Sequence, residues 1–391
     1  MSTWKEIFPT NGLCGGEDNH DFFMAQAVGI ARNGRGRTAP NPCVGAVLVK
    51  DGAIVAQGWH TAYGQLHAER ECIADAKNKG IDTVGATMYV TLEPCNHHGK
   101  TPPCTEGILE AGITKVVVGC EDPNPDVSGG GIAFLKEKGV EVITGVNEQS
   151  CKDLIEDFLI WKTTERTANI LKMATTLDGK IAARGGRAEA VSCPESFAGV
   201  HKLRAQVHAV IVGGNTFYGD NPSLTCRMDD LPEDFEQPYA VIVTSRLPKA
   251  FSGFKLLKHR PEKTIFWTTE FAAQSPLADT LRERGTHVWG MPTDLDAFKF
   301  EEGFRRLRDE LNCYITLCEG GGHLATSMLE QGMVDEFVMY LTPRVLGDEE
   351  GKSVFAGREV RSMNETLDMR LCCALPSGQD MRLVYRPKRN D

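Results

Sequence analysis

Two cysteines nine positions apart frame the most chemically distinctive stretch of this chain. The stretch reads TLEPCNHHGKTPPC, residues 91–104, and it places two histidines between Cys95 and Cys104. Thiolate sulfur and imidazole nitrogen are preferred ligands of zinc. Taken alone, the pair fits three kinds of site: a disulfide, a structural zinc site with four protein ligands, or a catalytic zinc site with one position open to water.

His67 and Glu69 supply what a catalytic zinc site would still need. His67 adds a third ligand, and Glu69 adds a carboxylate that can move protons while the metal makes water acidic. Zinc deaminases carry the motifs H-x-E, then P-C, then a second cysteine, and Pro94-Cys95 fits this order. A single H-x-E is common by chance, but the joint pattern is specific. It favours a catalytic zinc bound by His67, Cys95 and Cys104.

Helix geometry limits how His67 and Glu69 can share a site. Residues two apart on a helix point about 200° away from each other. The zinc must therefore lie off the first turn of the helix that we expect over residues 67–79. His97 and His98 lie between the two cysteines. A fourth protein ligand would leave no position for water, so we interpret both as supporting or substrate-contacting residues at most.

A second signature lies in CEGGGHLATS, residues 318–327, where a strand end, three glycines and a helix start follow one another. Backbone N–H groups and a helix N-terminus at such a turn can bind an anion such as a diphosphate. Residues 213–220, GGNTFYGD, form a second glycine-rich turn between a strand and a helix. The chain has no G-x-G-x-x-G fingerprint, and a glycine turn alone is a weak signal.

The elements that must position these residues alternate between buried strands and helices. In the first half we expect a helix capped by Asp18 or Asn19 that runs to about Asn33, a hairpin of two strands turned at Asp51-Gly52, and a layered α/β/α arrangement. The expected strands are 43–49, 53–59, 86–92, 115–120 and 140–144, and the expected helices are 67–79, 105–111, 132–139 and 151–163. A second α/β pattern follows, with strands at 169–175, 208–214, 239–245, 264–269, 314–320 and 336–343, and helices at 194–206, 301–311 and 323–331. We therefore expect a loose N-terminal extension at 1–17 and two domains at 18–164 and 165–391.

Composition and charge exclude several classes of protein. The chain has 391 residues, a net charge of −10 and 13 cysteines without a short disulfide framework. No apolar run reaches membrane length, and the N-terminus lacks a secretory pattern, so we expect a cytoplasmic protein with reduced cysteines and no membrane partner. The acidic charge argues against a nucleic-acid partner. The sequence leaves open whether the chain forms a homo-oligomer.

The chain resembles a known family, the bifunctional deaminase/reductase of riboflavin biosynthesis, over about residues 20–390. The eight-residue gap with HxGxTPPC inside it is that family's version of the deaminase motif. The resemblance rests on TAPNPCVGAVLV, GWH, HAE, LEPCNHHGKTPPC, DPNPDVSGGG, LDGKIA, LRAQVHAVIVG, DNPSLTCR and EGGGHLATSMLEQGMVDEFVMYLTPRVLG.

The resemblance implies a fold and two activities. The fold would be a cytidine-deaminase-like α/β/α sandwich followed by a dihydrofolate-reductase-like α/β domain. The first domain would deaminate 2,5-diamino-6-ribosylamino-4(3H)-pyrimidinone 5′-phosphate with zinc, and the second would reduce the ribosyl chain to ribityl with NADPH.

It also implies roles for individual residues. Glu69 would move protons, Lys172 would donate a proton or orient the ribose, and Arg204 and Arg227 would hold the ribose phosphate. The implied cofactor positions are Ala174, Ala190, Thr216, Asp220, Ser245, Gly321, Gly322, His323, Leu324, Ala325, Thr326 and Ser327. The implied substrate positions are Asn41, His60, Ala188, Arg204, Leu224, Arg227 and Glu319. Five of these residues also have a plainer interpretation: Asn41 as part of an Asn-Pro turn, His60 as a strand-end histidine, and Lys172, Arg204 and Arg227 as solvated charges.

One departure from the family pattern concerns the reductase. Ala188 and Ala190, in RAEAVSC, occupy places where the family usually has Ser and Trp. An aromatic wall of the nicotinamide or substrate pocket is then missing unless a neighbour such as Phe217 replaces it. Two alternatives therefore stay open: an active deaminase with an impaired reductase, and a structural zinc scaffold without catalysis.

Overall fold

The computed structural model describes residues 19–98, 102–123, 130–185, 189–294 and 297–388. The chain forms two compact units, residues 1–164 and 165–391. The expected N-terminal extension, residues 1–17, lies outside the described residues. No described helix is long and apolar enough to cross a membrane.

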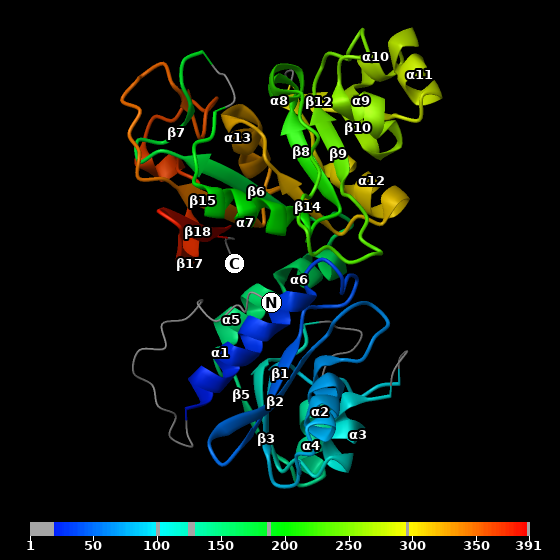
Figure 1. The fold of residues 1–391 in the computed structure, drawn as a ribbon, viewed down its shortest axis with the longest axis vertical. Coiled ribbons are helices and arrows are strands. Elements are labelled where there is room, and N and C mark those ends of the chain that lie inside the picture. Colours follow the sequence, from blue (N-terminus) through cyan, green and yellow to red (C-terminus); the bar gives the residue numbers. More distant parts are fainter. Residues whose placement is uncertain (1–18, 99–101, 124–129, 186–188, 295–296, 389–391) are drawn as a thin grey trace. The chain divides into compact units, whose positions relative to one another are not determined.

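The first unit is built on a five-stranded sheet in the order β2-β1-β3-β4-β5 (Figure 1). β1 is antiparallel to β2 and β3, whereas β3, β4 and β5 are parallel. The hairpin turns at Asp51 and Gly52, both with positive φ, as the Asp-Gly pair predicts. The strands are β1 (Gly45–Lys50), β2 (Ala53–Trp59), β3 (Thr87–Leu92), β4 (Lys115–Cys120) and β5 (Glu141–Thr144).

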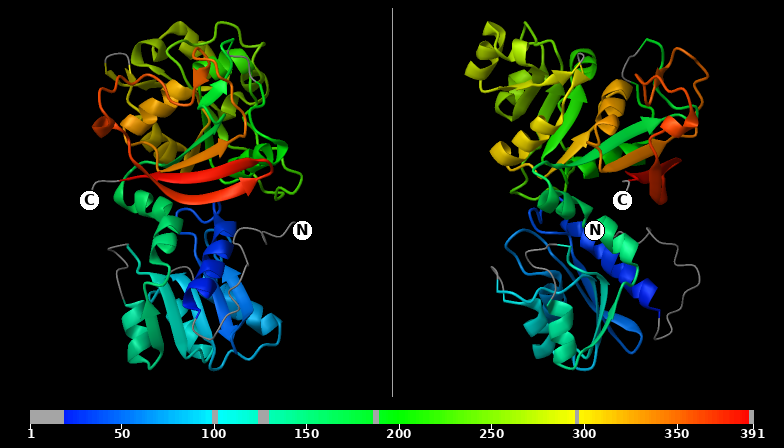
Figure 2. Two further views of the ribbon diagram at one scale, coloured as in Figure 1. Left: turned by 90° about the vertical axis from the view of Figure 1, so that its left-hand side faces the viewer. Right: turned by 180° about the vertical axis from the view of Figure 1, so that it is seen from behind.

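Helices cover both faces of this sheet, which confirms the expected α/β/α layers. α1 and α5 pack on one face, and α2, α3 and α4 on the other (Figure 2). Asn19 caps α1 by accepting a hydrogen bond from the Phe22 N–H. The helices are α1 (His20–Ala31), the short η1 (Arg32–Gly34), α2 (Ala68–Asn78), α3 (Cys104–Glu110), α4 (Gly131–Glu137), α5 (Glu148–Leu154) and α6 (Glu156–Thr163).

The single helix expected over 151–163 is wrong, because the structure has two helices there. At Ile155 the backbone leaves the helical region, with φ −105° and ψ 11°. Its N–H bonds to the Lys152 carbonyl three residues back, which tightens the turn and ends α5. The apolar periodicity runs through this break, so it could not indicate it.

The second unit contains a nine-stranded sheet in the order β11-β10-β9-β8-β14-β6-β15-β18-β17 (Figure 1). The seven strands from β11 to β15 are parallel, and β18 and β17 add an antiparallel hairpin at one edge. The sequence analysis identified neither this hairpin nor β11. The strands are β6 (Ala168–Thr175), β8 (Ala209–Gly213), β9 (Tyr239–Val243), β10 (Thr264–Thr269), β11 (His287–Met291), β14 (Ile315–Cys318), β15 (Glu336–Leu341), β17 (Met369–Ser377) and β18 (Asp380–Pro387).

Helices and short ribbons complete this unit. Its core gathers buried residues such as Trp267, Phe300 and Phe304 between the sheet and α12. The helices are α7 (Pro194–Arg204), α8 (Gly214–Asp220), α9 (Lys255–His259), η2 (Pro261–Lys263), α10 (Glu270–Ala273), α11 (Pro276–Glu283), α12 (Glu301–Leu311), α13 (Gly322–Glu330) and η3 (Met363–Glu365). Two small ribbons pair β7 (Lys180–Ala182) with β16 (Lys352–Ser353), and β12 (Thr293–Asp294) with β13 (Ala297–Phe298).

The strand order places both glycine-rich turns at the same end of the sheet, beyond the carboxyl ends of neighbouring parallel strands. β9, β8, β14 and β6 are adjacent and parallel, so their carboxyl ends lie side by side. The turn at Gly213-Gly214 follows β8, and the turn at Gly320–Gly322 follows β14. Open parallel sheets bind ligands in the crevice outside the carboxyl ends of their strands. The second unit is therefore expected to hold its ligands at the carboxyl ends of these strands.

Candidate active sites

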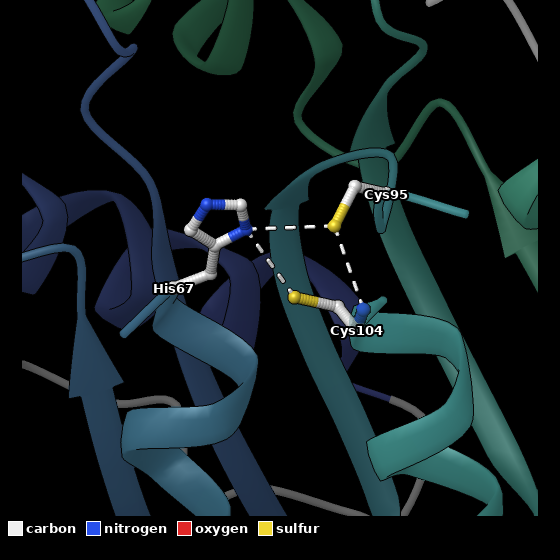
Figure 3. Close-up of side chains that lie close together, drawn as sticks. All are labelled: His67, Cys95 and Cys104. Atoms are coloured by element: carbon white, nitrogen blue, oxygen red, sulfur yellow. Dashed lines mark hydrogen bonds between the residues drawn. The ribbon is translucent and has the colours of Figure 1, made fainter. Parts of the chain in front are cut away.

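His67, Cys95 and Cys104 converge at one point of the first unit, as Figure 3 shows. The His67 Nδ1 atom lies 3.5 Å from the Cys95 Sγ atom and 3.4 Å from the Cys104 Sγ atom. A tetrahedral zinc at ordinary bond lengths would separate nitrogen from sulfur by about 3.6 Å. The three side chains therefore fit zinc, and they are the one cluster of metal-ligating side chains among the residues that the structure describes.

The fourth position is not taken by a protein ligand from the described residues. His97 and His98 are exposed, and His98 instead lies 3.6 Å from a Glu106 carboxylate oxygen. A site with three protein ligands can still accept water or substrate. The geometry therefore matches a catalytic zinc site.

The start of α2 explains how His67 and Glu69 share this site. His67 is the N-cap of α2 and has extended backbone, with ψ 162°, so helical periodicity does not separate the two side chains. Glu69 lies in the first turn and is only 3% exposed. Burial, reinforced by the neighbouring Cys95 sulfur, raises the pKa of Glu69 to about 7. A carboxyl group with such a pKa can both accept and donate a proton at neutral pH.

Hydrogen bonds hold the two cysteine ligands together. The Cys104 backbone N–H donates to the Cys95 sulfur, and the Thr105 N–H donates to the Cys95 carbonyl. Cys104 is the first residue of α3, and its hydrogen bond to Cys95, together with burial, raises the pKa of its own thiol. Hydrogen bonding from Cys104 and His67 lowers the pKa of Cys95, which favours its anionic form.

Two residues that the sequence analysis did not identify support this loop. The Arg70 guanidinium donates to the Pro102 and Pro103 carbonyls, at 3.2 and 2.6 Å, directly before Cys104. The buried carboxylate of Glu93 accepts from the backbone N–H groups of Asp122, Gly130 and Ile132. A carboxylate directly after a buried strand, in LEPC, is the signal that could have identified Glu93.

Asn41 and His60 lie next to the zinc ligands. The Asn41 side-chain amide donates to His60 Nε2 at 3.2 Å, and His60 Nδ1 donates to the Leu66 carbonyl at 2.9 Å. The His60 and His67 rings are 5.4 Å apart. Burial lowers the pKa of His60, so the imidazole is neutral with its proton on Nδ1. His60 is therefore a fixed, uncharged part of the site wall.

In the second unit, Lys172, Glu319 and Arg204 form a charged cluster, mostly shielded from solvent, at the carboxyl ends of the parallel strands. Arg204 forms a bidentate ion pair with the Glu319 carboxylate, at 2.6 and 3.0 Å, and also donates to the Thr225 carbonyl. The Lys172 ammonium lies 4.0 Å from Glu319. Burial lowers the pKa of Lys172. Burial alone would raise the pKa of Glu319, but Lys172 and Arg204 hold it below its ordinary value.

A second group of expected substrate residues lies along the loop after α8. Leu224 is buried and has a positive φ of 51°, a strained conformation for a branched side chain. Arg227 is exposed, and its backbone N–H donates to His201 Nδ1 at 3.1 Å. Arg204 uses Nε and both terminal nitrogens in contacts with Glu319 and Thr225, whereas Arg227 is exposed and has a terminal guanidinium nitrogen 3.4 Å from His201 Nε2. The two arginines are therefore not equivalent.

Gly321 and Gly322, in the turn after β14, differ in the free space beside their Cα atoms. A Cβ atom at Gly321 would have nothing within 4 Å, whereas one at Gly322 would lie 2.4 Å from the Ser353 carbonyl oxygen. The Ala325 N–H already bonds to the Gly321 carbonyl, and the Ala325 side chain is buried in the core. The space beside Gly321 is thus open to a ligand, which a helix N-terminus can bind if it is anionic.

Two family profiles match the chain. The profile of the RibD C-terminal domain matches residues 169–383, and the profile of the cytidine and deoxycytidylate deaminase zinc-binding region matches residues 17–120. The riboflavin biosynthesis protein RibD of Aquifex aeolicus is 38% identical over 364 residues, which span 93% of this chain and 97% of that protein. The chain belongs to the RibD family.

Solved structures of RibD proteins agree with this membership. The diaminohydroxyphosphoribosylaminopyrimidine deaminase/5-amino-6-(5-phosphoribosylamino)uracil reductase of Thermotoga maritima is 36% identical, with a TM-score of 0.73, and the match covers 94% of this chain and 99% of that one. RibD of Acinetobacter baumannii is 32% identical, with a TM-score of 0.72 and coverage of 95% and 99%. As a member of the RibD family, the chain is a bifunctional riboflavin-biosynthesis enzyme with a zinc-dependent deaminase domain and an NADPH-dependent reductase domain. The alternative of a zinc scaffold without catalysis is wrong.

The remaining expected cofactor positions of this RibD protein differ in how open they are. Thr326 faces inward, where its hydroxyl donates to the Gly322 carbonyl and accepts from the Ala356 N–H. The Ser327 hydroxyl accepts from Gln331, and Leu324 packs against the core, while His323 is exposed. The side chains from Ala325 to Ser327 are therefore engaged within the chain, and the open space in this segment lies at its beginning, beside Gly321. Ala174 follows Lys172 on the same face of β6, Thr216 is half-buried in α8, and Asp220 and Ser245 are exposed beyond β8 and β9.

Phe217, the candidate for supplying the aromatic side chain that position 190 lacks, lies in an aromatic cluster of its own. That ring is buried and stacks on Phe254 at a centroid distance of 4.4 Å, with Phe266 packed against its edge. Ala190 is exposed, and its carbonyl accepts a hydrogen bond from Arg344. Ala188 lies outside the described residues.

Proposed function

We propose that the chain acts twice on one phosphorylated pyrimidine. The first unit replaces one amino group of 2,5-diamino-6-ribosylamino-4(3H)-pyrimidinone 5′-phosphate by oxygen, consuming water and releasing ammonia. The second unit then reduces the ribosyl group to ribityl. The observation that carries the proposal is the three-ligand cluster of His67, Cys95 and Cys104 with Glu69 buried beside it, in a chain of the RibD family. The activity names of the T. maritima relative describe the same pair of reactions.

In the deaminase site, the chain's own residues would bind the substrate and move protons. Zinc, when bound, supplies the acidity that ionises water near neutral pH. Glu69 would accept the proton of that water and donate it to the leaving amino group. Asn41 and His60, fixed to each other and to the Leu66 carbonyl, would orient the pyrimidinone ring.

In the reductase site, the charged cluster would orient the ribose. NADPH supplies the hydride for the reduction. The Lys172 ammonium would donate the proton that accompanies it, and Glu319, held by Arg204, would hold the ribose hydroxyls. The N-terminus of α13 at Gly321 to Leu324 would bind the cofactor diphosphate, with Thr216, Asp220, Ser245 and Ala174 lining the same edge of the sheet.

We also propose small-molecule ligands and a cytoplasmic location. The net charge of −10 disfavours binding to a polyanion such as nucleic acid. The cysteines of the described residues are free, which suits a reducing compartment.

A two-step assay with metal analysis tests the proposal. Purified protein should release ammonia from the pyrimidinone, and should oxidise NADPH once the deaminated compound is present. Metal analysis should find one zinc per chain, and X-ray absorption should find one nitrogen and two sulfur ligands. Four protein ligands would contradict the catalytic site. Ammonia release without NADPH oxidation would instead favour the impaired reductase.

A further inference from the structure

His201 occupies a polar junction of the second unit that none of the roles above explains. It lies on α7, one turn before Arg204, and is only 5% exposed. Its Nδ1 atom accepts from the Arg227 backbone N–H at 3.1 Å, and its Nε2 atom lies 3.4 Å from a terminal guanidinium nitrogen of the same arginine.

The Arg227 backbone fixes the tautomer of this ring. A backbone N–H can only donate, so Nδ1 must be the unprotonated nitrogen, and the neutral ring carries its proton on Nε2. A guanidinium nitrogen also can only donate. The Nε2–H group of His201 and an N–H group of the Arg227 guanidinium are therefore two donors that face each other. Such a pair is satisfied when both donate to one acceptor, and an anion with several oxygens is the acceptor that fits.

The surroundings hold this pair in place. The Cys226 thiol donates to the His201 carbonyl, and the Gln237 amide bonds to both the N–H and the carbonyl of Cys226. The Phe197 ring packs edge-on against His201. Burial, followed by the charges of Arg204 and Arg227, lowers the pKa of His201, which agrees with a neutral imidazole.

Charge indicates which of the two nearby arginines can bind an anionic ligand. The Arg204 charge is neutralised by its bidentate pair with Glu319, so the exposed Arg227 is the arginine available to a ligand. We propose that His201 is a phosphate-binding residue of the reductase site, donating from Nε2 to the 5′-phosphate that Arg227 also binds. The inference rests on the proposed function, because that function supplies the phosphorylated substrate.

The phosphate itself provides the test. In His201→Asn, the side-chain oxygen can still accept the Arg227 N–H, but the donor at Nε2 is lost. For reduction of 5-amino-6-(5-phosphoribosylamino)uracil, the KM should rise about tenfold or more while kcat changes little, as expected for a lost hydrogen bond to a charged group. The same compound without its phosphate should show equal KM values in the variant and the parent. Lys202→Ala, the neighbouring exposed position on α7, is the control for a general loss of positive charge.

A binding measurement separates this inference from the proposed function. Ribose 5-phosphate is titrated into the full chain by calorimetry, with ribose as the control. The affinity for ribose 5-phosphate should fall about tenfold in His201→Asn and recover in part in His201→Gln, whose longer amide can again place a donor near the Nε2 position. Unchanged affinity in His201→Asn, equal losses on the phosphorylated and unphosphorylated compounds, or no binding of ribose 5-phosphate by the parent would each overturn the role of His201. If the parent binds ribose 5-phosphate but reduces neither compound, the proposed function fails while the binding result still decides the role of His201.

Discussion

The Lys172 ammonium nitrogen lies 4.0 Å from a carboxylate oxygen of Glu319, and the two side chains are only 15% and 11% exposed. Lys172 is on β6 and Glu319 directly follows β14, the strand beside it in the sheet. Burial disfavours the ammonium form, whereas Glu319 favours it. The protonation of Lys172 therefore depends on its carboxylate neighbour.

This relationship predicts the pH dependence of the reduction. If Lys172 donates the proton, the rate should fall as the pH rises through its pKa, which burial places below that of an ordinary lysine. Glu319→Gln should move this alkaline fall to a still lower pH, because the group that raises the Lys172 pKa is lost. Lys172→Arg keeps the charge but remains protonated above pH 12, so its residual rate should show no such fall. A rate–pH profile measured with saturating NADPH checks this, and an alkaline fall that persists in Lys172→Arg would assign it to another group.

Glu69→Gln should separate the two activities. The amide keeps the size of the side chain but cannot accept the proton of water, so deamination should slow by about 100-fold or more. The zinc content should be unchanged, because Glu69 is outside the ligand cluster. Reduction of the deaminated compound should be retained, because that chemistry lies in residues 165–391. Parallel loss of both activities would show that the assignment to two separate sites is wrong.

Arg70→Ala should weaken zinc binding without removing a ligand. Its guanidinium holds the two carbonyls directly before Cys104, so its loss frees the loop that carries this ligand. Loss of residues that support metal ligands typically costs about 10- to 100-fold in metal affinity or activity. Competition with a chromophoric chelator measures the affinity. Lys77→Ala, an exposed position on the same helix, is the control and should bind zinc as the parent does.

Gly321→Val should lower the NADPH affinity, whereas Gly322→Ala should lower the stability of the fold. The space beside Gly321 is open, so the valine variant should fold normally but lose NADPH affinity, because its side chain fills the space that the diphosphate needs. At Gly322 even a methyl group meets the Ser353 carbonyl, so the alanine variant should lose on the order of 1–3 kcal/mol of stability. Urea unfolding and NADPH titration of both variants distinguish these outcomes, with Gly253→Val as the control at another open glycine. Full NADPH affinity in Gly321→Val would place the diphosphate elsewhere.

Ala190→Trp should strengthen cofactor binding. Phe217 is locked in its own aromatic cluster, so the described residues give no sign that it replaces the missing wall. An aromatic ring stacked on the nicotinamide contributes about 0.5–1.5 kcal/mol, or roughly a two- to tenfold gain in affinity. NADPH titration and turnover of the variant and the parent decide this. Unchanged affinity together with unchanged turnover would mean that the pocket already compensates for the alanine.

Local patterns in the sequence were sufficient to pick out the three side chains that converge as candidate zinc ligands, and most of the secondary structure. The cysteine spacing, the preceding proline and the H-x-E motif limit the chemistry because they specify ligand types and a proton carrier together. Continuous apolar runs, such as those of β1, β4 and β9, indicated buried strands because a strand covered on both faces has no polar positions. The antiparallel edge hairpin β17–β18 was missed, because its residues are mostly part-buried or exposed and give no such run.

Tertiary structure decided which of the candidate residues meet. β14 lies between β8 and β6 in the sheet, an order that the chain sequence does not give, and this order places Glu319 beside Lys172. It also determined that Arg204 is engaged by Glu319 while Arg227 stays exposed, although the two arginines look alike in the sequence. The physical reason is that residue type and spacing set what a side chain can do, whereas its neighbours, burial and unpaired donors depend on contacts between residues far apart in the chain.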